Sequence, residues 1–289
     1  MESITLPPLT LEPACYVVAT PIGNLSDISL RALSLLGKIE YIFCEDTRVT
    51  NKLLQYYNCG KKKLIAYHKY SNEDICQKAI DLVKNGNAFA LMSDAGTPMI
   101  ADPGYQLINK LHLARIKTIA IPGCSSLVSA LCISGASTDH FQFFGFLPNS
   151  EESCSNFLVN IKNNDGTLIF FESPQRIITS LGNIAKHFGD RKIIIARELT
   201  KIYEEIITGK AVEVIEFLQN SPKKICGEIV LIIDKDYSKK ILEAELSPDT
   251  KNLINILQDS NISKKDIANI VAKYFKTNKK TIYQEIIKE

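Results

Sequence analysis

The sequence has few of the features that mark a membrane protein, a disulfide scaffold or a metal site. No apolar run approaches the roughly 18 residues that a membrane-spanning helix needs. The eight cysteines form no Cys-x-x-Cys pair, and none of the four histidines is near a cysteine or another histidine in the sequence. We therefore expect a cytoplasmic protein with reduced, mostly buried cysteines and no metal.

The chain also lacks an obvious targeting segment. Its first residues, "MESITLPPLTLEP", are acidic and interrupted by proline, unlike a secretory signal or an Arg-rich transit peptide. We expect residues 1–14 to form a flexible tail. With 289 residues, 45% hydrophobic and 23% charged, the remainder has the size and composition of a soluble protein with more than one domain.

The fold class follows from alternating patterns. Continuous apolar runs such as "CYVVATP", "EYIFCE" and "AFALMSD" alternate with segments of helical spacing. This alternation predicts an α/β fold, with a mainly parallel sheet covered by helices on both faces. We place an N-terminal α/β domain at 15–147 and a second, smaller α/β domain at 148–236, because "STDHFQFFGFLPNS" interrupts the alternation.

The last segment differs in composition. From residue 239 to the end, ten lysines face seven acidic residues, and "SKKD" at 263–266 has the pattern of a capping box that opens a helix. We expect a C-terminal helical domain at 237–289. Its mild positive charge favours an anionic partner, although an ordinary solvated surface explains it equally well.

Four predicted strands end in loops rich in Gly, Pro, Ser, Thr and Asp. The loops are "TPIGNLSD", "EDTR", "SDAGTPMIADPG" and "PGCSS". Each alone has the composition of an ordinary turn. Because ligands of such sheets bind beyond the carboxyl ends of the strands, four such loops on one edge predict a ligand site.

The residues of these loops restrict the ligand. "TPIGNL" has neither the lysine of a phosphate-binding P-loop nor the three spaced glycines of the dinucleotide motif. Asp94 and Asp102 would repel an anion, but they suit ribose hydroxyls, an ammonium group or a sulfonium. S-adenosylmethionine offers all three and has no phosphate, and an aminated small substrate also fits.

Arginine is scarce, with six residues beside 28 lysines, and three of the six follow strands. Guanidinium groups bind phosphate or carboxylate in a bidentate manner, so these three could contact an anionic substrate. The alternative is an internal ion pair, for instance between Arg48 and Glu45. With Lys52 and Lys201, these arginines could form a basic wall that faces the acidic loops. The predicted contacts to an anionic substrate are Arg48, Lys52, Arg176 and Arg197.

In the order found here, "VATPIGNLSDISLRAL", "EDTRVTNKLL", "SDAGTPMIADPGYQL", "PGCSSLVSAL", "FFGFLP", "FFESPQRI" and "ARELTKIYEE" resemble the ribosomal RNA small subunit methyltransferase I family. This family belongs to the tetrapyrrole methylase superfamily. The resemblance implies a homodimer that uses S-adenosylmethionine, bound between two domains, to methylate the ribose 2′-hydroxyl of a cytidine. The cytidine lies in 16S rRNA of the small ribosomal subunit.

The resemblance also assigns site residues. It implies cofactor contacts at Pro21, Gly23, Asp94, Ala95, Gly96, Thr97, Ser125, Ser126 and Phe171. One departure comes after "GFLP", where the family usually has a lysine and an arginine and this chain has Glu151 and Glu152.

A ribose hydroxyl is a weak nucleophile, so in-line positioning and removal of its proton are the two tasks for the enzyme. The candidates for orientation or base catalysis are Glu45 or Asp46 from the first domain and Lys201 or Glu204 from the second. Arg48, and with it Arg176, would hold a phosphate near the reacting group.

Three rival functions remain. A methyltransferase of the same superfamily that acts on a tetrapyrrole-like small molecule would share the fold and the cofactor, but would need neither the arginines nor the basic tail. A non-catalytic RNA-binding module would not need an acidic crevice. A kinase or nucleotidase is disfavoured by the absence of a phosphate cradle.

Overall fold

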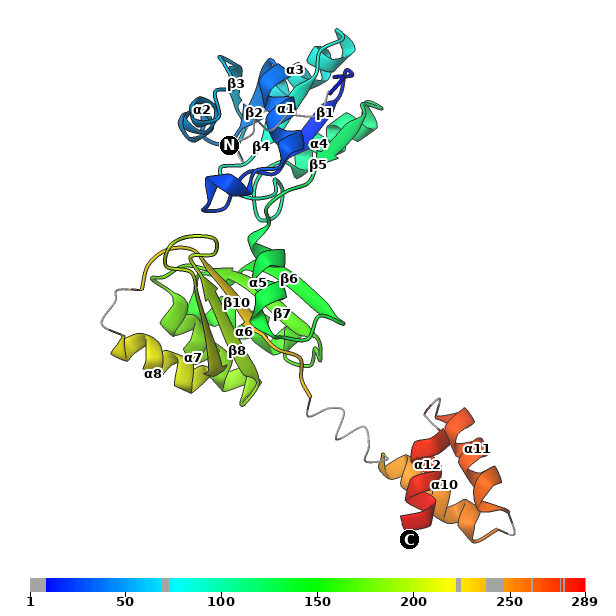
Figure 1. Ribbon diagram of the computed structural model, residues 1–289. Helices are drawn as coiled ribbons and strands as arrows, with labels where there is room; N and C mark the ends of the chain where they lie inside the picture. The colour runs from blue at the N-terminus through cyan, green and yellow to red at the C-terminus, as the bar shows by residue number, and fades with distance from the viewer. Residues whose placement is uncertain are drawn as a thin grey trace, which may run out of the picture. The chain divides into compact units, whose positions relative to one another are not determined.

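The computed structural model describes residues 9–68, 73–221, 225–237, 247–260, 262–275, 277 and 279–288. The chain forms two compact units, one of Met1–Lys162 with Thr167–Asp234 and one of Asn163–Gly166 with Lys235–Glu289 (Figure 1). Of the predicted flexible tail, residues 1–8 lie outside the described residues. Leu9 and Leu11 pack against the first hydrophobic core, and Lys38 Nζ donates to the Leu9 carbonyl at 2.6 Å.

The first unit contains two five-stranded sheets. The first sheet has the order β3-β2-β4-β1-β5, and all its strands are parallel. Its strands are β1 (Cys15–Val18), β2 (Tyr41–Cys44), β3 (Lys63–Ala66), β4 (Phe89–Met92) and β5 (Thr118–Ile121). Its helices are the 3₁₀ turn η1 (Leu25–Asp27), α1 (Leu30–Lys38), α2 (Thr47–Tyr56), α3 (Glu73–Lys84) and α4 (Tyr105–Leu113). Every strand therefore ends on the same edge.

Both faces of this sheet are buried, as the continuous apolar runs predicted. Alternate residues of a strand point to opposite faces: Tyr16 packs with Leu35 of α1, while its neighbour Cys15 packs with Leu107 of α4. Two separate hydrophobic clusters result, one under α1 and α2 and one under α3 and α4. The predicted α/β class with a helix-covered parallel sheet is confirmed.

The second sheet is mixed, with the order β6-β7-β10-β8-β9. Only β6 and β7 pair in parallel, and the other neighbours are antiparallel. Its strands are β6 (Phe141–Phe146), β7 (Thr167–Glu172), β8 (Lys192–Arg197), β9 (Glu205–Lys210) and β10 (Ile229–Ile233). Its helices are α5 (Ser126–Ser134), α6 (Glu151–Ile161), α7 (Ile177–Phe188) and α8 (Ala211–Asn220).

The helices divide between the two faces of this sheet. Leu158 of α6, Leu181 of α7 and Val214 of α8 belong to one core cluster. Ala130 and Leu131 of α5 belong to the cluster on the opposite face.

The sequence boundary at residue 147 differs from this arrangement. Helix α5 packs on β8 and β10, and β6 pairs with β7, so both elements belong to the second sheet. The alternation of strands and helices could not reveal this, because an apolar helix looks the same whichever sheet it covers. The aromatic residues between 141 and 146 form an edge strand rather than a linker.

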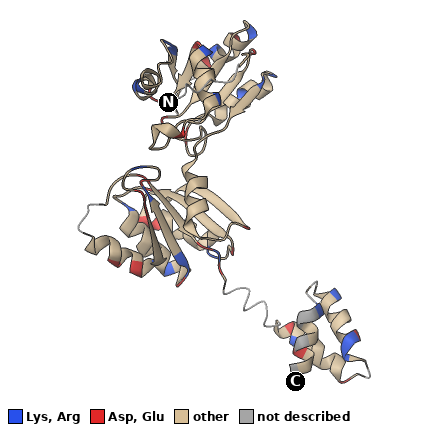
Figure 2. Cartoon of the chain, viewed as in Figure 1, with Lys and Arg blue, Asp and Glu red and all other residues tan. Residues whose placement is uncertain are grey.

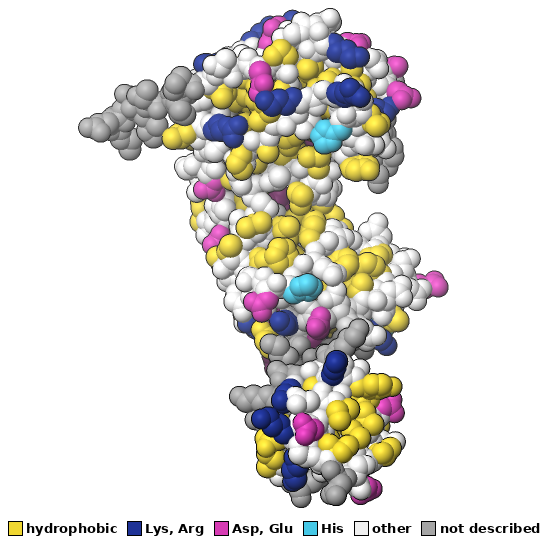
Figure 3. All heavy atoms as spheres, turned by 90° about the vertical axis from the view of Figure 1, so that its right-hand side faces the viewer, with side chains coloured by type: hydrophobic (Ala, Val, Ile, Leu, Met, Phe, Trp, Pro, Cys, Tyr) yellow, Lys and Arg dark blue, Asp and Glu magenta, His cyan; other side chains and the backbone are white. Residues whose placement is uncertain are grey.

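In its described residues, the second unit contains three helices, α10 (Pro248–Gln258), α11 (Lys264–Tyr274) and α12 (Lys279–Lys288). The Ser263 hydroxyl accepts from the Asp266 amide at 3.2 Å, at the predicted start of a helix. Ile254, Ile267 and Ile282 are among the residues of its small core. Figure 3 shows lysines and hydrophobic side chains exposed on this unit. In the described parts of the chain, no helix combines the length and apolarity needed to cross a membrane.

Candidate active site

Backbone hydrogen bonds join the loops at the carboxyl edge of the first sheet. The Thr20 amide donates to the Gly96 carbonyl at 2.9 Å, and the Gly96 amide donates back to Thr20 at 3.0 Å. The Thr97 hydroxyl donates to the Cys124 carbonyl at 2.8 Å. The loops after β1, β4 and β5 therefore form one surface. Gly96 has a φ of +79°, which a side chain would strain.

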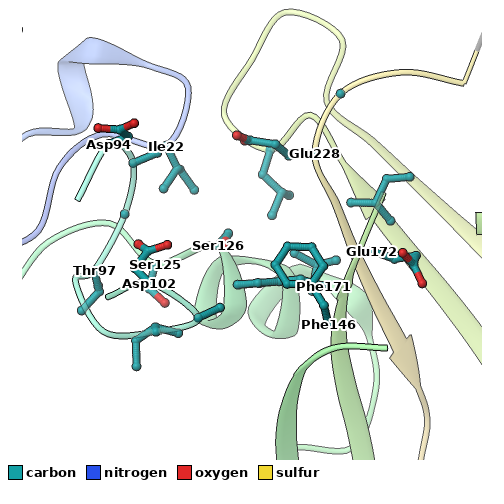
Figure 4. A pocket seen from close by; sticks show the side chains of 18 of the residues that line it. Ile22, Asp94, Thr97, Asp102, Ser125, Ser126, Phe146, Phe171, Glu172 and Glu228 are labelled. Atoms are coloured by element: carbon teal, nitrogen blue, oxygen red, sulfur yellow. The ribbon is translucent and has the colours of Figure 1, made fainter. Parts of the chain in front are cut away.

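A pocket of about 410 Å³ opens in the first unit between these loops and the second sheet (Figure 4). From the first sheet it is lined by Ile22, Glu45, Asp94, Ala95, Gly96, Thr97, Ile100, Ala101 and Asp102. From the second it is lined by Ser125, Ser126, Phe146, Phe171, Glu172, Ser173, Pro174, Leu199, Gly227, Glu228, Ile229 and Val230.

One end of the pocket is acidic. Glu45, Asp94 and Asp102 all line it, and Figure 4 shows Asp94 and Asp102 on the same side. Partial burial raises the pKa of each carboxyl, and Asp94 raises the pKa of Glu45 and Asp102 further because like charges repel. Asp94 Oδ1 accepts from the Asp46 amide at 3.1 Å, at the amino end of α2. A cation bound here would relieve the repulsion.

The opposite side of the pocket carries the aromatic rings and several aliphatic side chains, together with Glu228. Phe146 and Phe171 contact each other edge to face, with 5.7 Å between ring centroids, and Figure 4 shows both opposite Asp94 and Asp102. Ile22, Leu199 and Val230 line the pocket as well. This side offers a surface for a flat ring system.

No lysine or arginine is among the described residues that line the pocket. Figure 2 shows basic residues on the helices of the first unit, where acidic ones also occur. A phosphate would therefore meet carboxylates without a compensating cation. The pocket fits a ligand that combines a positive charge, hydroxyl groups and a flat apolar ring.

The pocket brings together seven of the nine predicted cofactor residues: Asp94, Ala95, Gly96, Thr97, Ser125, Ser126 and Phe171. Pro21 and Gly23 do not line it, but they flank Ile22, which does. Gly23 serves a close approach between loops, because a Cβ there would lie 2.6 Å from Lys201 Cγ and 2.9 Å from the Leu199 carbonyl oxygen.

Of the predicted catalytic residues, only Glu45 lines the pocket. Asp46 caps α2, accepting from the Arg48 amide at 2.8 Å, and forms an ion pair with the Arg48 guanidinium at 2.6 Å. The internal partner of Arg48 is therefore Asp46 and not Glu45. Hydrogen bonds from Arg48 hold the pKa of Asp46 well below its usual range, so this carboxylate stays ionised.

Lys201 and Glu204 lie in the loop between β8 and β9. Lys201 Nζ forms ion pairs with Glu198 at 2.9 Å and with Glu228 at 3.4 Å. Burial lowers the pKa of Lys201, but these two carboxylates raise it more, so the amine stays protonated. Glu204 Oε2 accepts from the Thr200 amide at 2.6 Å. Both side chains thus stabilise the loop.

Two of the predicted RNA contacts are structural. Arg197 is buried, with 8% of its surface exposed, and pairs with Glu205 at 2.5 Å. Arg176 pairs at 2.6 Å with Glu172, whose side chain is fully buried, and also donates to the Leu147 carbonyl. Internal partners thus engage both guanidiniums, of which Arg197 is buried and Arg176 keeps 26% of its side chain exposed.

The other two predicted RNA contacts lie on α2. The Arg48 side chain is 86% exposed even though it pairs with Asp46, and Lys52, one turn later, is exposed. The acidic departure at Glu151 and Glu152 occupies the first turn of α6, where negative charge is stabilised by the helix dipole.

Sequence reasoning missed the segment 227–230 that lines the second half of the pocket. The sequence signal for the site is the composition of the loops after strands, whereas this segment lies at the beginning of β10. Because β10 is antiparallel to β7 and β8, its amino end lies beside their carboxyl ends. Sequence reasoning also missed Glu172. Figure 4 shows its carboxylate turned away from the pocket, and this carboxylate accepts a hydrogen bond from the Ser180 hydroxyl.

Known proteins are similar to this chain in sequence and in fold. Residues 14–215 match the family model described as Tetrapyrrole (Corrin/Porphyrin) Methylases. Ribosomal RNA small subunit methyltransferase I of Rickettsia prowazekii (strain Madrid E) is 40% identical over 283 residues, which cover 97% of this chain and 99% of the relative. The chain belongs to the ribosomal RNA small subunit methyltransferase I family of tetrapyrrole methylases. The resemblance stated from the motifs is confirmed.

A second member of the family, the protein of the same name from Pasteurella multocida (strain Pm70), is 37% identical over 270 residues, covering 93% of this chain and 95% of the relative. Among solved structures, a diphthine synthase matches with a TM-score of 0.56 and 14% identity, covering 76% of this chain and 89% of that chain. The methyltransferase CobJ matches with a TM-score of 0.56 and 15% identity, covering 77% and 94%. At these identities the two structures establish the fold alone.

The Arg176–Glu172 pair gives a stability prediction. Arg176→Ala leaves the buried carboxylate of Glu172 without its cation and is expected to lower the free energy of unfolding by about 3 kcal/mol or more. Arg48→Ala removes an exposed pair and is expected to change the free energy of unfolding far less. Urea denaturation measures both, and equal losses would contradict the structural role of Arg176.

The crowded carboxylates give a prediction on pH. The pKa of Asp102 is raised in the folded state, so its ionisation opposes folding at neutral pH and this cost disappears as the pH falls through the raised pKa. Asp102→Asn is therefore expected to increase the free energy of unfolding at pH 7 without ligand. The gain should shrink towards pH 4, and Glu216→Gln, at an exposed position of α8, is the control variant. Urea denaturation across this pH range is the measurement.

Proposed function

We propose that the protein transfers a methyl group from S-adenosylmethionine to the ribose 2′-hydroxyl of a cytidine in 16S rRNA of the small ribosomal subunit. The observation that carries the proposal is the pocket, in which Asp94 and Asp102 lie across from Phe146 and Phe171, Glu45 is a further lining carboxylate, and no basic residue is among the described lining. The names of the full-length relatives support the ribosomal RNA substrate. By resemblance, the proposal includes a cytoplasmic homodimer.

The residues present fit the cofactor. S-adenosylmethionine supplies a methyl group on a positively charged sulfur and also carries an ammonium group, ribose hydroxyls and an adenine ring. Asp94 and Asp102 suit the cationic and hydroxyl groups, while Phe146 and Phe171 suit the ring. The joined loops around Gly96 present a preformed wall, so little order has to be gained on binding.

The proton of the acceptor hydroxyl needs a recipient, and Glu45 suits this role best among the predicted candidates. It lines the pocket, and burial together with Asp102 and Asp94 raises the pKa of its carboxyl, which makes it a stronger base than usual. Asp46 is a weaker base because Arg48 lowers its pKa. We assign Asp46 to orientation, since its amide binds Asp94 and its carboxylate holds Arg48.

Arg48 and Lys52 are proposed to contact RNA phosphates. Both lie on α2, whose amino end adjoins Asp94 and hence the pocket. A phosphate bound there would lie beside the acidic end without entering it. The anionic substrate would then bind at the two basic side chains, and the cationic cofactor would bind at the carboxylates.

The decisive experiment uses small ribosomal subunits that lack the modification. Incubation with S-adenosylmethionine labelled on its methyl group is expected to place label on the ribose of one cytidine, mapped by mass spectrometry. Glu45→Gln should lower kcat by roughly 10²–10⁴-fold, as expected for loss of a general base. Label on a base, or only on a tetrapyrrole offered in parallel, would contradict the proposal.

The phosphate contacts give a further prediction. Each phosphate contact contributes about 0.7–0.9 to the slope of log affinity against log salt. Arg48→Ala and Lys52→Ala are each expected to reduce the slope for binding to small subunits by about that amount. Lys84→Ala, an exposed lysine at the far end of α3, serves as the control. An unchanged slope in both α2 variants would remove these residues from the RNA contact.

A further inference from the structure

The loop between β8 and β9, residues 198–204, differs from an ordinary surface turn. Its base is closed by Arg197 and Glu205, which face each other in the strand register and form an ion pair at 2.5 Å. Because Arg197 is buried, this pair fixes where the loop leaves the sheet.

Hydrogen bonds within the loop define its shape. The Lys201 amide donates to the Glu198 carbonyl at 3.0 Å, and the Glu204 amide donates to the Lys201 carbonyl at 3.1 Å. Glu198 and Thr200 have φ values of +52° and +65°, a region that residues other than glycine rarely adopt. Such strain persists only where the surroundings fix the backbone. The backbone of residues 198–204 therefore has one defined conformation.

The loop adjoins the pocket and the loop after β1. Leu199 and Glu228 line the pocket, and Lys201 pairs with Glu228 at 3.4 Å. Gly23, in the loop after β1, leaves room for the Lys201 side chain. The loop thus stands at the edge of the pocket.

The tip exposes two large hydrophobic side chains. Ile202 is 94% exposed and Tyr203 is 71% exposed. Lys201, the one cation of residues 198–204, is engaged by two carboxylates, so the tip does not have the chemistry of a phosphate contact. An aliphatic residue beside an aromatic one is the combination that stacks on, or inserts between, nucleic-acid bases.

The proposed reaction creates a need for such a contact. A nucleotide that is stacked in folded RNA has to leave its stack before its ribose can approach a pocket, and side chains that replace the lost stacking offset the cost. We propose that Ile202 and Tyr203 stack against a base of the RNA substrate at the acceptor nucleotide or next to it, and so position the acceptor ribose at the pocket. This inference rests on the proposed function, and both are positioning residues.

The test compares the double variant Ile202→Ala/Tyr203→Ala with the wild type on small ribosomal subunits. The lost stacking is expected to raise KM for subunits about 10- to 100-fold, with kcat within about 2-fold. The Kd for S-adenosylmethionine, measured by calorimetry, should stay unchanged. Tyr203→Phe keeps the ring and should retain the wild-type KM. Leu113→Ala removes a hydrophobic side chain that is 78% exposed at the carboxyl end of α4 and is the control.

Each remaining outcome has one meaning. A wild-type KM in the double variant, with the wild-type enzyme active, overturns the stacking proposal and leaves the methyltransferase proposal intact. A Tyr203→Phe variant as impaired as Tyr203→Ala shows that the ring is not what binds, and also overturns it. Loss of a dimer in the double variant, seen by sedimentation, assigns the tip to a second copy of the chain instead. A wild-type enzyme that does not methylate subunits overturns both proposals.

Discussion

Mutual repulsion among Glu45, Asp94 and Asp102 is the constraint on which the site depends. Three partly buried carboxylates converge from the ends of β2 and β4. Burial raises the pKa of all three, Asp102 and Asp94 raise the pKa of Glu45 further, and Asp94 raises that of Asp102. Backbone groups hold them in place: the Asp46 amide binds Asp94, and the loop that contains Asp94 is joined to the loop after β1. The fold therefore maintains an arrangement of charge that its own electrostatics oppose, and a cationic ligand is what would stabilise it.

The two sheets contribute different chemistry. The first supplies charge and backbone polarity from the common edge of parallel strands, while the second supplies Phe146, Phe171 and the start of β10. Each sheet has its own hydrophobic core, so the packing of each sheet fixes the wall of the pocket that it supplies. The contact at Gly23, where only a glycine leaves room for Lys201, joins the edges of the two walls.

The sequence predicted those features that depend on local pattern. Apolar strands buried on both faces predicted the parallel sheet, and the composition of the loop around Asp94 predicted an acidic ligand site. The sequence did not predict the assignment of α5 and β6 to the second sheet, because pairing and helix placement depend on partners distant in the chain. The sequence also did not show that Arg48 is exposed whereas Arg197 is buried. Both arginines lie at strand ends, and their exposure depends on the tertiary structure.

The position of β10 has a consequence for how the protein is made. It is the last strand of the first unit in the sequence, yet it lies in the centre of the second sheet, between β7 and β8. During synthesis on the ribosome, β7 and β8 are made before the strand that separates them, so the centre of the second sheet stays unfilled until residues 229–233 follow. A nascent chain that ends before this strand therefore has an incomplete second sheet and only one finished wall of the pocket.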